Sequence, residues 1–437
     1  MLLKKLVNKI TNRSDFLNSV LVVMSGTAIS QLIAMAVMPF LSRNYTPSDF
    51  GFLTAFISVF SIIGTFINGK YERVILLARN NQELNNSSIL CFLSSILVSV
   101  GTLIVVLLGQ NVFLDYYGIN QDFYNWFYLL PVILFVYGFN VTILSYLNYK
   151  EDYKTISTSR VVKTLTSTIF SVLGIYFMKN FGGLILGELI GYVVSTLILG
   201  NKIGGIYDFT SYSFSEVKKL AIKYKTFPVY NIPSDLFNAI SSQMPSFFLI
   251  AFFGANTTGQ YALMKKIIDA PISLFSSSIL EVFRQKAAEQ YTKVGSCREL
   301  FIKTAKSLTI ISGPPFLVLF IFGPQLFSFF FGKEWYIAGV YARIFSIFYF
   351  FKFISSPLSY MFYIAGRSKL DFVLHLYIFI SSLFIFYIPK WISVSVDSVL
   401  WIYSLNFIVI YLFYFVYSYK FTVNDNFDCE KMHLENN

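Results

Sequence analysis

Charged side chains are scarce in this sequence. Only 13% of the 437 residues are Asp, Glu, Lys or Arg, whereas 55% are hydrophobic, and the mean hydropathy is +0.62. Soluble globular domains carry about 25% charged residues, so the composition excludes that class. It also excludes an intrinsically disordered chain, which combines low hydrophobicity with high charge. We therefore expect the protein to fold in a lipid bilayer.

Cysteine and histidine are also rare. The three cysteines, Cys91, Cys297 and Cys429, are scattered and show no disulfide-framework spacing, and the two histidines form no metal-binding pattern with them. The sequence contains no phosphate-binding loop, no dinucleotide fingerprint and no HExxH motif. We therefore expect no cofactor, no metal and no energy input from bound ATP.

Long apolar runs recur along the whole chain. About 20 helical residues cross a hydrocarbon layer of roughly 30 Å. The runs predict an all-α polytopic membrane protein with twelve transmembrane helices. We place them near residues 16–41, 50–68, 88–108, 123–147, 160–178, 182–200, 232–253, 260–282, 302–331, 335–364, 370–389 and 397–418.

The basic residues orient these helices. Most of the 34 Lys and Arg residues fall on the side of the N-terminus. The opposite side has only Arg43, Lys179, Lys333 and Lys390, and four more basic residues, Lys265, Lys266, Arg343 and Lys352, fall inside spans. This bias predicts that both termini are cytoplasmic. It also accounts for the net charge of +11 without a nucleic-acid partner.

The longest polar connection divides the predicted spans into two halves of six. We therefore expect an N-terminal six-helix lobe, a cytoplasmic linker, a C-terminal six-helix lobe and a cytoplasmic tail. Their bounds are 1–200, 201–226, 227–419 and 420–437. In the first lobe, Gly183, Gly187 and Gly191 follow a small-xxx-small spacing that predicts close helix packing.

Polar residues inside the spans point to function, because lipid does not tolerate them. In the seventh span, a polar face extends over about four helical turns. Its members are Asn231, Ser234, Asp235, Asn238, Ser241, Ser242 and Ser246. In the eighth span, Lys265, Lys266 and Asp269 lie on a similar but interrupted stripe. Two interpretations stay open for this stripe: a helix contact that neutralises its own charges, or a water-filled, partly basic cavity.

Other polar residues lie in or beside spans, and ordinary roles stay open for them: a packing contact for Gln31 and Glu188, and a position at the membrane interface for Lys70, Glu72 and Arg73. Arg343 and Lys352 fall on opposite faces of the tenth span and cannot line one cavity unless that helix breaks. The remaining candidates are Gln31, Lys70, Glu72, Arg73 and Glu188.

Three segments, taken in order, resemble the Wzx-type flippases of polysaccharide repeat units, such as those of O-antigen or capsule, in the MOP (multidrug/oligosaccharidyl-lipid/polysaccharide) exporter superfamily. They are Leu41-Ser42-Arg43-Asn44-Tyr45-Thr46-Pro47-Ser48-Asp49-Phe50-Gly51, Lys70-Tyr71-Glu72-Arg73-Val74-Ile75-Leu76-Leu77 and Tyr224-Lys225-Thr226-Phe227-Pro228-Val229-Tyr230-Asn231-Ile232-Pro233. The resemblance covers most of the chain. The family often has Leu-Pro where this sequence has Leu77-Ala78.

This resemblance implies a MATE-like fold of two six-helix lobes around a central cavity in the bacterial inner membrane. The implied cargo is an undecaprenyl-pyrophosphate-linked oligosaccharide, which crosses to the periplasmic leaflet by alternating access without bond breakage. Implied partners are the bilayer, a polysaccharide polymerase and chain-length regulator proteins. The implied pyrophosphate ligands are Lys70, Arg73, Lys265, Lys266 and Arg343, and the implied sugar ligands are Gln31, Asn231, Asn238, Ser242 and Ser246. Glu72, Asp235, Glu188 and Asp269 are candidates for ion coupling.

Two other functions stay open. A MATE-like exporter of small organic cations would favour an acidic cavity over paired lysines. A membrane glycosyltransferase or polysaccharide polymerase would present catalytic residues on a sizeable outer loop, but the predicted outer loops are short and almost uncharged.

Overall fold

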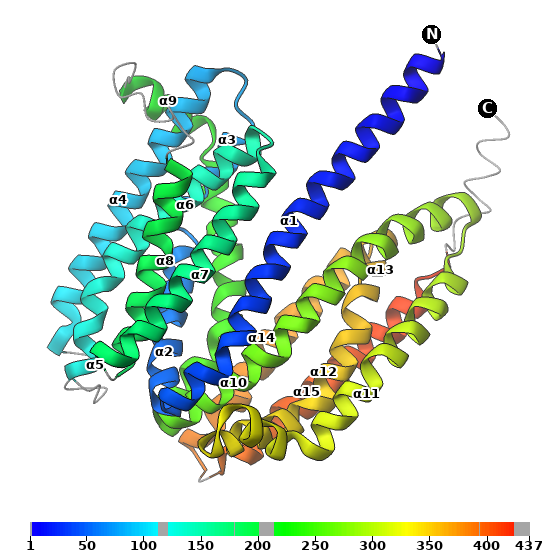
Figure 1. Cartoon of the computed structure of the whole chain (residues 1–437). Coiled ribbons are helices and arrows are strands. Elements are labelled where there is room, and N and C mark those ends of the chain that lie inside the picture. Colours follow the sequence, from blue (N-terminus) through cyan, green and yellow to red (C-terminus); the bar gives the residue numbers. More distant parts are fainter. Residues whose placement is uncertain (1, 112–120, 179, 201–213, 393, 424–437) are drawn as a thin grey trace. The chain divides into compact units, whose positions relative to one another are not determined.

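The computed structural model describes residues 2–111, 121–178, 180–200, 214–392 and 394–423 (Figure 1). Within these residues the structure is helical, and the β-pairing is confined to one isolated bridge between Ser296 and Val423. The chain divides into two compact units, which are described separately. Unit 1 comprises Met1–Tyr45 and Phe52–Gln243, and unit 2 comprises Thr46–Gly51 and Met244–Asn437.

Unit 1 is a bundle of long helices. Its elements are α1 (Leu2–Asn44), α2 (Pro47–Gly64, from Phe52 onward), α3 (Glu72–Ile75), α4 (Asn81–Asn111), α5 (Gln121–Asn125), α6 (Leu130–Tyr149), α7 (Tyr153–Phe177), α8 (Gly182–Gly200), α9 (Phe214–Lys223) and the first turns of α10 (Ile232–Val294). α7 packs against α1 and α8, while α6 packs against α4 and α8 (Figure 1).

Small residues let α7 and α8 approach closely, as the glycine spacing predicts. A β-carbon added at Gly183 would lie 2.8 Å from the Gly174 α-carbon, and one at Gly187 would lie 2.4 Å from the Ser171 hydroxyl. A β-carbon at Gly191 would lie 2.9 Å from the Lys163 carbonyl oxygen. The predicted packing role of this stripe is therefore confirmed.

The described part of unit 2 contains the first turn of α2, the rest of α10 and five further α-helices. These are α11 (Arg298–Phe331), α12 (Tyr336–Leu358), α13 (Met361–Ile364), α14 (Ser368–Tyr387) and α15 (Val396–Lys420). α12 packs against α11 and α15, and α14 packs against α15. Aromatic rings fill much of the space between α12 and α15, where Phe348 and Phe407 meet at 5.3 Å between ring centroids.

α10 is interrupted at Gly254, whose positive φ of 84° falls outside helical geometry. The helix that follows crosses the start of α2 at van der Waals distance within unit 2. A β-carbon added at Gly259 would lie only 1.7 Å from the Pro47 carbonyl oxygen, and one at Gly51 would lie 1.9 Å from the Ala255 carbonyl oxygen. Glycine is required at both positions because any larger side chain would force the two backbones apart.

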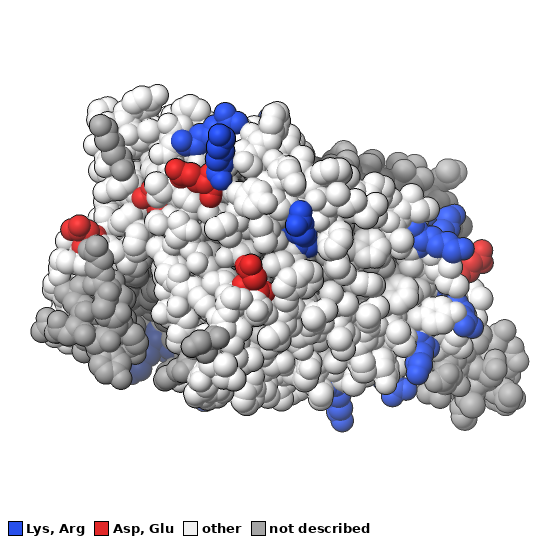
Figure 2. All heavy atoms as spheres, turned by 90° about the horizontal axis from the view of Figure 1, so that it is seen from below, with Lys and Arg blue, Asp and Glu red and all other residues white. Residues whose placement is uncertain are grey.

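The chain is a multi-pass membrane protein, but the expected count of twelve spans is not confirmed. Ten helical segments among the described residues are long and apolar enough to cross a bilayer. α7 is not one of them, because Lys154, Arg160, Lys163 and many hydroxyl side chains lower its hydropathy. α10 contributes one long segment where the sequence suggests two spans. Figure 2, a view turned by 90° from Figure 1, shows scattered Lys, Arg, Asp and Glu side chains on a face that consists mostly of uncharged residues.

The predicted lobe bounds stay a prediction. Part of the predicted linker, 201–213, lies outside the described residues, and so does most of the predicted tail. The described part of the linker includes α9. This short helix buries Val217 and Leu220 against Val74 and Leu90, so it packs on the same part of unit 1 that carries α3.

Candidate functional site

The chain breaks its helical path between α2 and α3, and this break carries the first predicted site residues. After Gly64 the backbone passes through tight turns until α3 begins at Glu72. Gly69 (φ 59°) and Lys70 (φ 62°) both adopt the left-handed conformation. Glycine adopts it without steric cost, whereas a lysine there costs roughly 1–2 kcal/mol. Surrounding contacts must therefore hold Lys70 in place.

Asn68 supplies such contacts. Its buried amide nitrogen donates to the Gly138 carbonyl and to the Thr142 hydroxyl, each at 3.1 Å, and both acceptors belong to α6. Its amide oxygen accepts from the Ser95 hydroxyl of α4 at 2.6 Å. Because leaving such a buried amide unpaired would cost about 1–3 kcal/mol, these bonds fix the segment against α4 and α6. Asn68 thereby positions Lys70.

Asp235 of α10 joins two of the predicted cations. Its Oδ2 atom lies 2.9 Å from Lys70 Nζ and 2.8 Å from Arg73 Nη2. The Lys70 side chain is 11% exposed, that of Asp235 is 32% exposed and that of Arg73 is 45% exposed. Water screens the Arg73 pair more strongly, so the Lys70 pair contributes more to stability. One carboxylate thus faces two cations, which leaves the trio with an excess positive charge.

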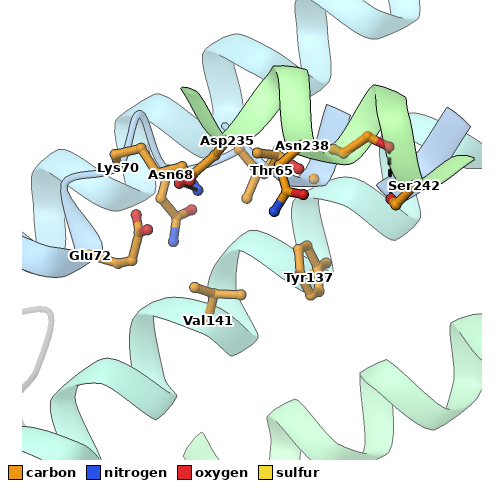
Figure 3. Close-up of a pocket in the computed structure, with 12 residues that line it drawn as sticks. Thr65, Asn68, Lys70, Glu72, Tyr137, Val141, Asp235, Asn238 and Ser242 are labelled. Carbon is orange, nitrogen blue, oxygen red and sulfur yellow. Dashed lines mark hydrogen bonds and ion pairs between the residues drawn. The ribbon is translucent and has the colours of Figure 1, made fainter. Parts of the chain in front are cut away.

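This trio borders a pocket of about 380 Å³ inside unit 1 (Figure 3). Lys70 comes from the segment after α2, and Asp235, Asn238 and Ser242 follow one another along one edge of α10 (Figure 3). Tyr137 of α6 contributes to the facing wall (Figure 3). The volume is at the low end of the roughly 300–1,000 Å³ typical of ligand sites. The pocket therefore suits one compact polar group, such as a single sugar ring, rather than an extended chain.

Glu72 also lines this pocket. Burial raises the pKa of its carboxyl group above the ordinary value, while the positive charges of Lys70 and Arg73 act in the opposite direction. Glu72 therefore keeps its proton to a higher pH than a solvated glutamate does. The structure thus brings together four residues that the sequence placed in different roles, Lys70, Glu72, Arg73 and Asp235.

A second charged cluster lies inside unit 2. Asp269 of α10 forms an ion pair with Lys352 of α12, with 3.4 Å between Oδ1 and Nζ. The Lys352 ammonium also lies 4.9 Å from the ring centroid of Tyr349. Helical spacing suggests Lys265 as the partner of Asp269 and gives no indication of Lys352. Lys265 and Lys266 lie one turn before Asp269 on α10. The Lys265 side chain is half-buried and that of Lys266 is exposed.

Arg343 faces a different neighbour from Lys352, as their predicted opposite orientation requires. Its Nε and Nη2 atoms donate to the carbonyls of Phe320 and Ile321 in α11, at 3.0 and 3.1 Å. Pro324 has no N–H group, so it cannot supply the helical hydrogen bond that the Phe320 carbonyl would otherwise accept. Arg343 satisfies this carbonyl. Its predicted role as a pyrophosphate ligand stays a prediction.

Glu188 is engaged inside unit 1. Its carboxylate pairs with Lys163 of α7 and accepts from the Ser167 hydroxyl at 3.2 Å. The Lys163 ammonium lies 4.6 Å from the Tyr192 ring centroid, and the Tyr192 ring lies 5.4 Å from that of Tyr137 in the pocket wall. This half-buried pair therefore adjoins the pocket through two aromatic rings.

The other predicted sugar ligands do not line the described part of the pocket. Gln31 is half-buried in α1, Asn231 is half-buried in the π-helical turn before α10, and Ser246 is buried further along α10. Sequence reasoning in turn missed Asn68 and Tyr137. The Asn68-Gly69 dipeptide is a sequence signal for a turn. It indicates that the second span ends in a turn and not in a continuous helix.

The structure thus defines a multi-pass membrane protein built of apolar helical bundles with partly buried ion pairs, and unit 1 also contains a polar pocket. Among solved structures, an inward-facing multidrug MATE transporter of the MOP superfamily matches with a TM-score of 0.67, 14% identity and coverage of 91% of this chain and 92% of that one. An outward-facing MATE transporter matches with a TM-score of 0.60, at 14% identity and with 92% and 94% coverage. A MOP superfamily transporter from Pyrococcus furiosus, described as having a binding pocket of reverse polarity, matches with a TM-score of 0.58, 14% identity and 92% and 94% coverage. These matches establish a MATE-like fold.

Residues 40–340 match the family model described as "Polysaccharide biosynthesis protein", and the chain belongs to this family. The family indicated by the sequence motifs is thereby confirmed, together with its MOP-type fold. No curated protein sequence gives a significant match.

Proposed function

We propose that this protein is a flippase that moves undecaprenyl-pyrophosphate-linked oligosaccharide repeat units from the cytoplasmic to the periplasmic leaflet of the bacterial inner membrane. The observation that carries the proposal is the polar pocket of unit 1, which lies within a membrane-embedded bundle of a polysaccharide biosynthesis protein. Lipid would not tolerate these polar groups, so they require a hydrated or ligand-filled space. No covalent bond changes in this reaction.

The pocket chemistry suits a sugar. Asn238 offers both amide donors and an amide acceptor, Ser242 and Tyr137 offer hydroxyl groups, and all three line the same space. A sugar ring presents hydroxyl groups that both donate and accept, and it stacks well on an aromatic ring. A volume of about 380 Å³ accommodates one residue of the oligosaccharide at a time, with the rest of the cargo outside the pocket.

The pyrophosphate requires cations that can exchange partners. Lys70 and Arg73 share one carboxylate in the described structure, so Asp235 and a pyrophosphate would compete for the same two cations. Arg73 is the more exposed of the two and would exchange first. Lys265 and Lys266 stay proposed pyrophosphate ligands within unit 2, where the carboxylate of Asp269 pairs with Lys352. The lipid tail can stay in the bilayer throughout.

We further propose that both termini are cytoplasmic, in accordance with the excess of basic residues on that side. The translocated repeat unit would then be delivered to a polysaccharide polymerase working with a chain-length regulator. Glu72, whose carboxyl group keeps its proton to a raised pH, is the first candidate for coupling transport to a proton gradient.

Deletion of the gene and mass spectrometry of lipid-linked intermediates test the proposal. We expect an undecaprenyl-pyrophosphate oligosaccharide to accumulate and surface polysaccharide to be lost. Complementation with Lys70→Gln should fail to restore surface polysaccharide, whereas Lys225→Gln, which alters an exposed lysine outside the pocket, should restore it. Normal surface polysaccharide in the deletion strain would refute the proposal.

A MATE-like exporter of organic cations is the second candidate, because Glu72 and Asp235 give the same pocket two carboxyl groups. Their pairing with Lys70 and Arg73 makes the pocket less attractive to a cation. Increased susceptibility of the deletion strain to cationic drugs, with no change in lipid-linked intermediates, would favour this exporter.

A further inference from the structure

A second pocket opens on unit 2, between the first turns of α11 and the last turns of α15. We call it the α11–α15 groove, and it encloses about 490 Å³. Phe301, Ile302 and Ile310 of α11 and Phe415 of α15 give it apolar walls. Its α11 lining extends from residue 301 to residue 310, which corresponds to about 14 Å along a helix. This depth matches one leaflet of a hydrocarbon layer of roughly 30 Å.

Two cations lie along the α11 side of this groove, Lys306 within its lining and Arg298 about one turn before it. Lys306 is the only charged residue among the described residues that line it, and it forms no ion pair within the described part of the chain. Side chains lean towards the N-terminus of their helix, so the Lys306 ammonium lies towards the start of α11. Arg298, the first residue of α11, donates from Nε to the Tyr419 hydroxyl at the end of α15, and its guanidinium lies 4.6 Å from the ring centroid of Tyr419.

We propose that the α11–α15 groove binds an anionic phospholipid, with an acyl chain along the apolar walls and the phosphate held by Lys306 and Arg298. A basic rim above an apolar groove is complementary to this lipid, whose charge and chain lie in the same order along the membrane normal. An isoprenoid chain of the transported cargo is longer than one leaflet and fits the groove depth less well. The groove shares no lining residue with the pocket of unit 1, and the inference does not depend on the proposed transport function.

Native mass spectrometry of the purified full-length protein tests this inference. Phosphatidylglycerol and phosphatidylcholine with the same acyl chains would be titrated into the protein in detergent. We expect phosphatidylglycerol to bind more tightly than phosphatidylcholine. Lys306→Gln and Arg298→Gln should each weaken phosphatidylglycerol binding about fivefold, since one basic residue near a membrane surface contributes about this much. Lys303→Gln, which removes an exposed lysine of the same helix outside the groove, should leave binding unchanged.

A second variant tests the apolar part of the site. Thr309 lines the groove with an exposed side chain, so Thr309→Trp fills the groove and removes only the hydrogen bond from its hydroxyl to the Ala305 carbonyl of the same helix. We expect this variant to lose phosphatidylglycerol binding while the charge of the rim stays intact. The proposal is overturned by equal binding of both phospholipids, by an equal effect of Lys303→Gln, by unchanged binding to Thr309→Trp, or by displacement of phosphatidylglycerol by an equimolar polyprenyl phosphate.

Discussion

The ion pair between Lys70 and Asp235 should couple more strongly than any surface pair of unit 1. At 2.9 Å and an effective dielectric constant of about 20, the attraction is about 6 kcal/mol before opposing terms. Desolvation and the loss of side-chain freedom offset most of it. Because Lys70 is only 11% exposed, we expect a net coupling of about 2 kcal/mol. Arg73, at 45% exposure, should couple to Asp235 by less than about 1 kcal/mol.

A double-mutant cycle measures this coupling. Lys70→Gln, Asp235→Asn and the double variant would be unfolded reversibly in mixed micelles, and the three changes in unfolding free energy would be compared. The matched control is the cycle for Lys219 and Glu216, an i,i+3 pair in α9 whose side chains are 70% and 45% exposed. We expect about 0.5 kcal/mol or less for that pair. A Lys70–Asp235 coupling no larger than the control value would refute the assignment of Asp235 as the central anion of the site.

Three further predictions follow from backbone geometry and burial. In the same assay, the Lys70→Gly variant should be more stable than the Lys70→Gln variant by about 1 kcal/mol. Both substitutions remove the ion pair, but only glycine relieves the backbone strain at φ 62°. Equal stabilities of the two variants would exclude strain at this position. Gly259→Ala should destabilise the protein by about 3 kcal/mol, because the added β-carbon would overlap the Pro47 carbonyl oxygen. The control Gly101→Ala, whose added β-carbon meets no atom within 4 Å, should stabilise its helix by about 1 kcal/mol. A higher melting temperature for Gly259→Ala than for Gly101→Ala would contradict the close helix crossing. Glu72 has a raised pKa, so its protonated form stabilises the fold at acidic pH, and this contribution is lost as pH rises from 4.5 through the raised value. Glu72→Gln should therefore gain in melting temperature relative to wild type as pH rises through that window, and a parallel pH profile for both proteins would disprove the burial of Glu72.

Hydropathy and charge bias predicted the class of protein correctly, whereas the count of twelve spans is not confirmed. α7 shows why, since its Arg160 donates to the Thr27 hydroxyl of α1 and its Lys163 pairs with Glu188 of α8. These polar side chains lower the hydropathy of the helix, yet neighbouring helices satisfy them. A sequence window records only the polarity of each residue and contains no information about its partner.

The polar face of α10 was predicted in part. Helical periodicity places Asp235, Asn238 and Ser242 on one side of the helix, and these three residues line one pocket. Ser246 lies on the same predicted face but is buried elsewhere, beyond the end of the pocket lining. Periodicity defines which residues share a face, but it does not define how far along that face a cavity extends.

The amino-acid sequence by itself determined that this chain spans a membrane, which family it belongs to and which face of α10 is polar. These properties depend on composition, on residue order and on the 3.6-residue helical repeat, all of which are local. Only the tertiary structure decided that Asp235 pairs with Arg73, 162 residues away, and with the strained Lys70. Ion pairs form between groups that are close in space, and that proximity arises from the packing of helices that are distant in the chain.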